Sequence, residues 1–390
     1  MNGYVKVVAT SDLHFGNVRV APETLYSKLR YYLYPELKDC HLLIIAGDIY
    51  DQLLTVGSKA HSYACRFISE VFRISHDTGM QVRILHGTYS HDRDQLSVFS
   101  SLALPKTRYK IVNTIECEEI TDLRFNTDTV YMTLKVGYLP DNLSYKRSED
   151  AIEHLKRSMS CLGWNTLDMI VGHGTFSHVI KPDSGHSPPC LYEVEQFHPW
   201  VTGPIIMGHI HTSSKNSGVY YCGSFERLAH GEEEDKGFYV LTCDQKKQEG
   251  WRSKFVVDKT ATKFVTIVPS SDDVPAIMQE FVDKVEENFP DRNGFVRVVH
   301  KSPEVRSLLH KICVQQFPNI SYSSKSTGEV EVHQIRMDEI TLDLLDDVKP
   351  NIHNLGELSY QFLEENDMLG DVTKEDILSR MERIIKQITE

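Results

Sequence analysis

The sequence predicts an α/β fold, and three features of the chain support this prediction. Short apolar runs of strand-like composition alternate with helical patterns over the first two thirds of the 390 residues. Five of these runs lead directly into a loop that carries Asp or His. Glycine stands in four of these loops, which allows a tight turn off a strand. Since ligands of α/β sheets bind at the carboxyl ends of the strands, these features also predict a polar site there.

The expected elements follow from the local patterns of the chain. The five strands are expected at 4–10, 41–47, 81–85, 168–172 and 204–208. Helices are expected at about 22–34, 58–77 and 149–161, and the second of these has its apolar residues at helical spacing. The stretch 181–192 is rich in Pro, Gly and Ser and is expected to be a loop.

Composition changes after about residue 260, which predicts three domains: 1–260, 261–340 and 341–390. The middle one should be a small α+β unit, with strands at 263–269 and 294–300 and helices at 273–288 and 303–316. The last stretch is acidic, with nine Asp or Glu against four Lys or Arg over 350–390. Two amphipathic helices are expected there, at about 355–366 and 373–389. Their apolar faces must cover either a partner or their own domain.

Composition narrows the class of protein. A net charge of −13 argues against a protein that coats nucleic acid. No apolar run approaches the roughly 20 residues that cross a bilayer, and the N-terminal residues do not resemble a secretory signal. The eight cysteines form no CxxC pair, so reduced thiols and a cytoplasmic location are expected.

The residues that follow the five strands are the ones that bind metal ions. Each short motif is common in loops when taken alone, but their order behind five strands indicates one shared site. His and Asp supply nitrogen and oxygen ligands to Mn, Fe or Zn, and a carboxylate can bridge two cations that together clamp a phosphoryl group. In chain order they are Asp12 and His14, Asp48 and Asp51, His91 and Asp92, His173, and His209 and His211.

These motifs resemble those of the calcineurin-like metallophosphoesterases. Within that superfamily, the segment 220–238, YYCGSFERLAHGEEEDKGF, is similar to the SbcD-type DNA repair exonucleases, which occur in bacteria and phages. The resemblance covers about residues 4–260 by motif and 261–390 by architecture alone. It implies a four-layer β-sandwich flanked by helices, a small capping domain that contacts DNA, and C-terminal helices that bind a partner.

The resemblance also implies two Mn²⁺ ions, with Mg²⁺ as the alternative. Asp12, His14, Asp48 and His211 would hold one ion, and Asp48, His173, His209 and a residue of the third loop would hold the other. That loop departs from the family's Gly-Asn-His-Asp, because two residues are inserted between Gly87 and His91. Counting back from His91 places Ser90 at the Asn position. A hydroxyl is a weaker ligand than an amide carbonyl, so Ser90 could bind directly, bind through water or leave the second ion loosely held.

The expected reaction is hydrolysis of a DNA phosphodiester during recombination or repair. By resemblance, His91 would stabilise charge or protonate the leaving oxygen, oriented by Asp92 or by a carbonyl. Asp51 would lie behind the ligands or beside the phosphate, or would cap a helix. The residues Lys246, Lys247, Trp251, Arg252 and Lys254 are a candidate DNA patch, with a solvated hairpin as the alternative.

Two kinds of partner protein follow from the resemblance. Residues 350–390 would bind an SbcC-type ABC ATPase, and the nuclease domain would form a homodimer; no membrane contact is expected. Two rival functions stay open at this stage. One is a phosphatase or small-molecule phosphodiesterase on the same fold. The other is a non-catalytic scaffold whose second metal site is incomplete.

Overall fold

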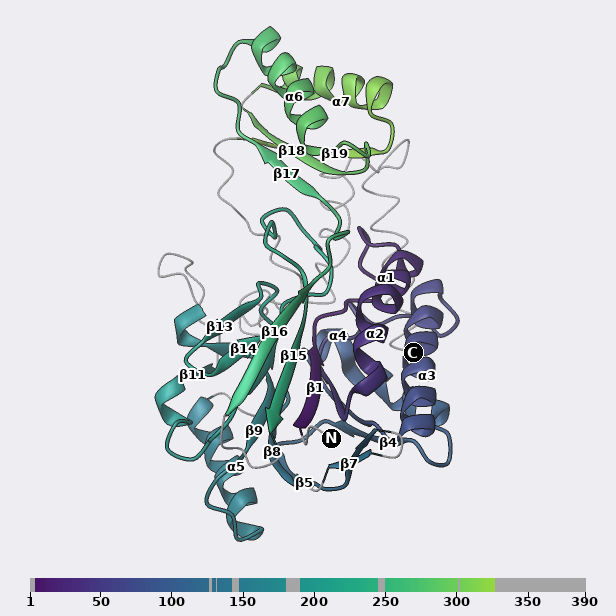
Figure 1. Cartoon of the computed structure of the whole chain (residues 1–390). Coiled ribbons are helices and arrows are strands. Elements are labelled where there is room, and N and C mark those ends of the chain that lie inside the picture. Colours follow the sequence, from purple (N-terminus) through teal and green to yellow (C-terminus); the bar gives the residue numbers. More distant parts are fainter. Residues whose placement is uncertain are drawn as a thin grey trace, which may run out of the picture. The chain divides into compact units, whose positions relative to one another are not determined.

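The computed structural model describes residues 4–125, 128–130, 132–141, 147–179, 190–244, 250–300 and 302–326 (Figure 1). These residues belong to the first of two compact units, Met1–Thr327. The second unit, Gly328–Glu390, lies outside the described residues, and so do the expected helices at 355–366 and 373–389. The α/β prediction is confirmed, because helices pack on two six-stranded sheets of mixed strand direction.

The first six-stranded sheet contains three of the predicted strands at its centre. The four neighbouring strands β1 to β4 are parallel to one another, with β4 at one edge; on the other side, β15 pairs antiparallel with β1, and β16 pairs antiparallel with β15. Across the sheet the order is β16 (Trp251–Val257), β15 (Gly237–Asp244), β1 (Tyr4–Thr10), β2 (Leu42–Ala46), β3 (Gln81–Leu85) and β4 (Arg108–Val112).

The second six-stranded sheet contains the other two predicted strands. Its central strands are parallel, and an antiparallel strand closes each edge. Across the sheet the order is β13 (Ser214–Asn216), β14 (Val219–Tyr221), β12 (Ile205–Gly208), β9 (Met169–His173), β8 (Leu134–Leu139) and β5 (Glu116–Ile120). Short pairs β6 (Leu123–Phe125) with β7 (Asp128–Val130) and β10 (Thr175–Phe176) with β11 (Leu191–Tyr192) complete this part of the chain.

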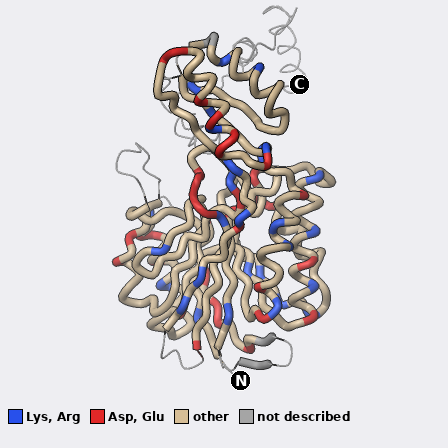
Figure 2. Tube along the Cα trace, turned by 45° about the horizontal axis from the view of Figure 1, so that its top comes forward, with Lys and Arg blue, Asp and Glu red and all other residues tan. Residues whose placement is uncertain are grey.

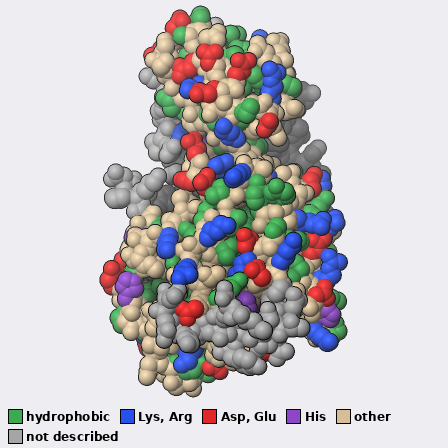
Figure 3. Space-filling model, viewed as in Figure 1, with side chains coloured by type: hydrophobic (Ala, Val, Ile, Leu, Met, Phe, Trp, Pro, Cys, Tyr) green, Lys and Arg blue, Asp and Glu red, His purple; other side chains and the backbone are tan. Residues whose placement is uncertain are grey.

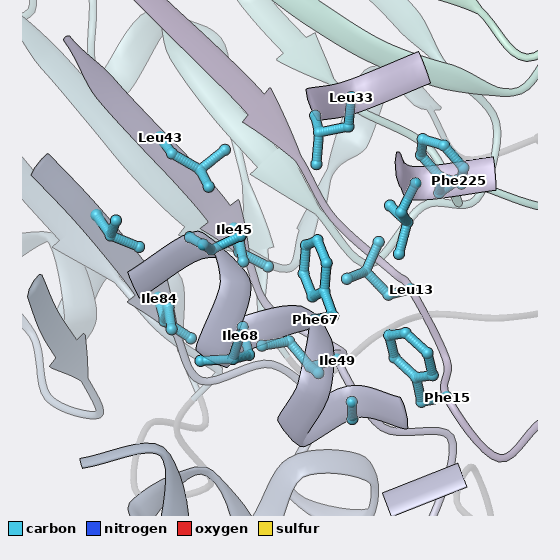
Figure 4. Close-up of a cluster of buried hydrophobic side chains, with 14 of the residues drawn as sticks. Leu13, Phe15, Leu33, Leu43, Ile45, Ile49, Phe67, Ile68, Ile84 and Phe225 are labelled. Atoms are coloured by element: carbon cyan, nitrogen blue, oxygen red, sulfur yellow. The ribbon is translucent and has the colours of Figure 1, made fainter. Parts of the chain in front are cut away.

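Three hydrophobic clusters hold these elements in layers. Side chains of both sheets, such as Ile44 and Val136, form one buried cluster, so the sheets pack face to face. A second cluster joins the first sheet to helix α3 (Lys59–Thr78), where Phe67 and Ile68 meet Ile45 (Figure 4). A third joins the second sheet to helix α5 (Ser148–Cys161). Burial of both faces explains why the central strands are continuous apolar runs.

The predicted helices form with clear local causes. Helix α3 begins after Ser58, whose side chain accepts a hydrogen bond from the His61 N–H, and it ends at Gly79 in the left-handed conformation. The helix expected at 22–34 extends over α1 (Pro22–Lys28), a π-helical turn at Leu29–Leu33 and α2 (Tyr34–Glu36). The short helix α4 (Tyr89–Asp92) and a 3₁₀ segment at Arg93–Leu102 follow β3.

Residues 264–326 form a separate sheet with its own core. Strands β17 (Phe264–Ile267), β18 (Gly294–His300) and β19 (Ile320–Ser326) are parallel, and helices α6 (Val274–Asn288) and α7 (Pro303–Gln316) connect them. The expected α+β arrangement is therefore wrong for this unit, because each crossover helix returns the chain to a parallel strand. Phe281, Val296 and Leu309 lie in its buried cluster.

Two further observations concern the described residues. All eight cysteines lie within them, and each is a free thiol. No helix in the part of the chain that the structure describes is long and apolar enough to cross a membrane.

Candidate metal centre

Five loops bring the predicted polar residues together at the carboxyl ends of strands from both six-stranded sheets. They follow β1, β2 and β3 of the first sheet and β9 and β12 of the second. Four of the residues have left-handed backbone angles that L residues rarely adopt: Asp12, His14, Asp48 and His209, with φ of 49°, 49°, 53° and 85°. Such strain persists where surrounding structure imposes it, and it is concentrated at functional sites.

The first cluster consists of Asp12, His14 and His211. One ligand atom of each lies within 4.8 Å of the others. The Nε2 atoms of His14 and His211 are 3.1 Å apart, so the two imidazole rings point their Nε2 atoms toward each other. Asp12 is fully buried, and its carboxylate also accepts the backbone N–H of His209. Asp12 therefore connects the first loop to the loop after β12.

The second cluster consists of Asp48, His173 and His209. Nε2 of His173 lies 3.3 Å from Oδ2 of Asp48. The same carboxylate oxygen lies 3.9 Å from Nε2 of His14. Asp48 is thus placed between the two clusters, which is the position expected of a carboxylate that contacts two cations.

Thr88, rather than Ser90, faces the second cluster. The Thr88 N–H donates to Asp48 Oδ1 at 2.6 Å, and its hydroxyl lies 3.2 Å from Asp48 Oδ2 and 3.3 Å from His173 Nε2. The buried Ser90 hydroxyl has no hydrogen-bond partner among the described residues. The two residues that follow Thr88, Tyr89 and Ser90, belong to α4, so Thr88 is a second candidate for the ligand role expected of Ser90. A Cβ at Gly87 would lie 2.1 Å from Asp48 Oδ1, so this approach requires glycine.

Three of the cluster histidines present Nε2 to the clusters and have an oxygen from outside the clusters beside Nδ1. Nδ1 of His173 lies 2.8 Å from the Ala46 carbonyl, in a hydrogen bond, whereas Nδ1 of His14 lies at an ion-pair distance of 3.2 Å from Asp51 Oδ1. Nδ1 of His211 lies 2.9 Å from Glu232 Oε1. Histidines that bind metals in proteins are held in this way, because the outer hydrogen bond fixes the ring and its tautomer. Sequence reasoning missed Glu232, whose acidic neighbours offered no signal to single it out.

His91 lies beside the first cluster and close to Asp51. Its ring centre is 5.0 Å from that of His14, and one ligand atom of each of His14, Asp51 and His91 falls within 4.8 Å of the others. Its Nδ1 contacts the backbone carbonyl of Asp51. Of the two expected ways to orient His91, the structure therefore contains the carbonyl contact.

Asp92 holds the backbone of the loops that follow β2 and β3. It is fully buried, and its two carboxylate oxygens accept the N–H groups of Asp48, Ile49, Tyr50 and Gly87 at 2.8–3.2 Å. Both oxygens are occupied by backbone donors, so Asp92 acts by fixing the loops that follow β2 and β3. The role expected of Asp92, to orient His91, stays a prediction.

The buried charges perturb one another strongly. Burial opposes protonation of His173, but the charge of Asp48 and the hydrogen bond to it raise the pKa of His173 to about 10. Burial and the charge that His173 carries lower the pKa of His209 to about 4. The pKa of Asp48 stays well below its usual value because neighbouring histidines outweigh its burial. The lowered pKa of Asp48 and the raised pKa of His173 both favour an ion pair between these two residues. Clustered shifts of this kind indicate a functional site.

This donor set fits divalent cations of the Mn, Fe and Zn type, which prefer imidazole nitrogens together with carboxylate oxygens. The residues able to hold them are Asp12, His14 and His211 on one side and Asp48, His173 and His209 on the other. The hydroxyl of Thr88 adds an oxygen to the second group.

The residues of the candidate DNA patch lie in different environments. Arg252 and Lys254 are exposed on β16, and Lys and Arg side chains are visible over the face where β13 to β16 lie (Figure 3). Trp251 instead packs against the cluster between the sheets and lies tightly over Gly203. Its ring is therefore a poor platform for stacking. Lys246 and Lys247 lie outside the described residues. Along the chain, acidic and basic residues are interspersed (Figure 2).

Comparison with known proteins leaves the family open. No family model and no curated protein matches the chain. Solved structures do match, and one whose description names no protein aligns with 66% of this chain and 100% of its own, at 10% sequence identity and a TM-score of 0.36. Likeness at that level does not distinguish among α/β proteins.

Proposed function

We propose that this chain is a metal-dependent DNA nuclease of the SbcD type, which hydrolyses phosphodiester bonds in recombination or repair. The observation that supports it most strongly is the pair of Asp and His clusters that meet at Asp48. When bound there, two divalent cations would neutralise charge on a phosphodiester and activate water for in-line attack. The face-to-face sheets flanked by helices agree with the layered sandwich that the metallophosphoesterase resemblance implies.

The residues of the chain have distinct parts in this proposal. Asp12, His14, Asp48 and His211 would hold one cation, and Asp48, Thr88, His173 and His209 would hold the other. His91 acts on the substrate, because its ring stands beside His14 while the Asp51 carbonyl fixes Nδ1 and leaves Nε2 to move a proton or stabilise charge. Asp51 positions His14 through its carboxylate and His91 through its carbonyl.

The choice of DNA over a small phosphodiester depends on the segment 220–238. This segment is the part of the sequence that resembles the nucleases, and it lies directly against the first cluster through Glu232 and Lys236. The additional sheet of residues 264–326 also supports a large substrate. The proposed ATPase-binding segment 350–390 lies outside the described residues, and a homodimer remains part of the proposal.

Digestion of end-labelled linear double-stranded DNA tests the function. We expect the purified chain to degrade DNA with Mn²⁺ and to stop when EDTA is added. His91→Asn should lower the rate by about 100-fold or more, the usual contribution of a general acid or base. His198→Asn, on an exposed residue away from the site, should leave the rate unchanged.

Other outcomes point to the two rival functions. Hydrolysis of bis(p-nitrophenyl) phosphate without any cleavage of DNA would favour a small-molecule phosphodiesterase. Inactivity on both substrates, even with an SbcC-type ATPase added, would favour a non-catalytic scaffold. Equal rates for His91→Asn and the parent would remove His91 from the proposed mechanism while leaving the metal site intact.

A further inference from the structure

We propose that Glu232 is a positioning residue that holds the ring of His211 for metal binding, and that the buried Lys236 holds Glu232 and the backbone of His211. The inference rests on the proposed function, because it concerns a ligand of the first cluster. It assigns a specific task to one member of the acidic run Glu232–Asp235, which the sequence presents as four similar residues.

The contacts of Glu232 set it apart from the rest of that run. Its Oε1 lies 2.9 Å from His211 Nδ1, and its Oε2 lies 3.0 Å from Lys236 Nζ. The second oxygen also accepts the backbone N–H of Leu228 at 3.1 Å. Its side chain is only 15% exposed. Glu233, Glu234 and Asp235 are exposed by contrast.

Lys236 fixes the same histidine through its backbone. This lysine is fully buried, and its ammonium donates to the His211 carbonyl at 2.9 Å and to Ser224 Oγ at 3.0 Å. A buried ammonium is costly unless it is paired and hydrogen-bonded. Glu232 supplies the pairing charge, so the two side chains hold both the ring and the backbone of His211.

The consequence for metal binding follows from the two nitrogens of the ring. A carboxylate beside Nδ1 favours the tautomer that carries its proton there. The lone pair is then on Nε2, which is the atom that faces His14 in the first cluster. Loss of such an outer partner typically weakens metal binding about 10–100-fold, because the ring is neither oriented nor polarised.

Manganese titration of the full chain tests this inference without using DNA. Free Mn²⁺ is followed by electron paramagnetic resonance for the parent, Glu232→Gln, Glu232→Asp, Glu233→Gln and His211→Ala. We expect Glu232→Gln to raise the Kd of one binding phase by about 10–100-fold. That phase should be the one lost in His211→Ala. Glu233→Gln removes the same charge one residue away and should bind as the parent does.

The outcomes separate this inference from the proposed function. Parent-like binding by Glu232→Gln, within about twofold, would overturn the inference and leave the metal centre in place. No Mn²⁺ binding by the parent would overturn both. Circular dichroism with EDTA shows whether each variant is folded. If Glu232→Gln unfolds, Glu232→Asp replaces it, because this variant keeps a carboxylate to pair with Lys236. Parent-like binding by that replacement would likewise overturn the inference.

Discussion

Thr88 brings a hydroxyl into a group otherwise made of carboxylate and imidazole. Its oxygen lies 3.2 Å from Asp48, 3.3 Å from His173 and 3.5 Å from His209. A hydroxyl can donate as well as accept, so it satisfies Asp48 when no cation is bound and offers a lone pair when one is. This dual capacity suits a position that must be stable in both states.

Two replacements of Thr88 should change the affinity of the second cluster for Mn²⁺ in opposite directions. Thr88→Val keeps the shape and removes the oxygen, so binding should weaken about 2–10-fold, the value of one hydrogen-bond-sized interaction. Thr88→Asn adds an amide carbonyl and should tighten binding by a similar factor. Mn²⁺ titration measures both. Ser90→Ala should bind as the parent does; weaker binding by Ser90→Ala than by Thr88→Val would return the ligand role to Ser90.

The choice between Ser90 and Thr88 shows which question one sequence leaves undetermined. His91 and Asp92 form a recognisable pair, so counting back from them is a reasonable way to place the missing Asn. An insertion between two fixed points can lie at either end, and the residue types do not decide which. The close contact between Gly87 and Asp48 places the residue after Gly87, which is Thr88, beside the second cluster.

At the level of elements, a partly buried ion pair joins the two six-stranded sheets. Arg83 on β3 donates to both carboxylate oxygens of Glu118 on β5, at 2.9 and 2.7 Å. The hydroxyl of Tyr138 on β8 donates to the same carboxylate at 2.9 Å. Burial raises the pKa of Glu118, but Arg83 outweighs it and the pKa is lowered overall.

Glu118→Gln should lower the free energy of unfolding by about 3 kcal/mol near neutral pH, because it leaves a buried guanidinium without its counter-charge. The pKa of Glu118 is lower in the folded state, so its stabilisation is present above the unfolded value of about 4.5 and is lost as pH falls through the folded value. Urea unfolding at about pH 7 and about pH 4 measures the difference between variant and parent. Glu119→Gln, on an exposed neighbour, is the matched control. A difference that grows on acidification would contradict this account.

The elements that sequence analysis located best are the ones buried on both faces. Strands β2 and β3 were expected within a residue or so of their bounds, since continuous apolar runs leave little choice. Strands β4 and β5 were missed because their side chains are mostly half-buried and polar. Strand β19, ISYSSKS, carries too few apolar residues to be recognised without its parallel partner β18.

At the scale of the whole molecule, the candidate metal centre lies at the junction of the two sheets. Asp12, Asp48 and Thr88 come from loops of the first sheet, while His173 and His209 come from the second. Cations bound here would therefore add to the polar contacts, such as those of Asp12 with the His209 N–H and of His173 with the Ala46 carbonyl, that already join the two sheets at this edge. The buried carboxylates would also lose their mutual repulsion.

Mn²⁺ should consequently raise the thermal unfolding temperature of the full chain. A ligand present at about 100 times its Kd stabilises the folded state by about 2.7 kcal/mol, which corresponds to a rise of roughly 5 °C for a domain of this size. Differential scanning calorimetry with Mn²⁺ and with EDTA measures the rise. Asp48→Asn should lose most of it, because this carboxylate lies within reach of both clusters. Asp77→Asn, exposed at the end of α3, removes the same charge and should keep it. An equal rise in Asp48→Asn and the parent would mean that Mn²⁺ stabilises the chain at some other place.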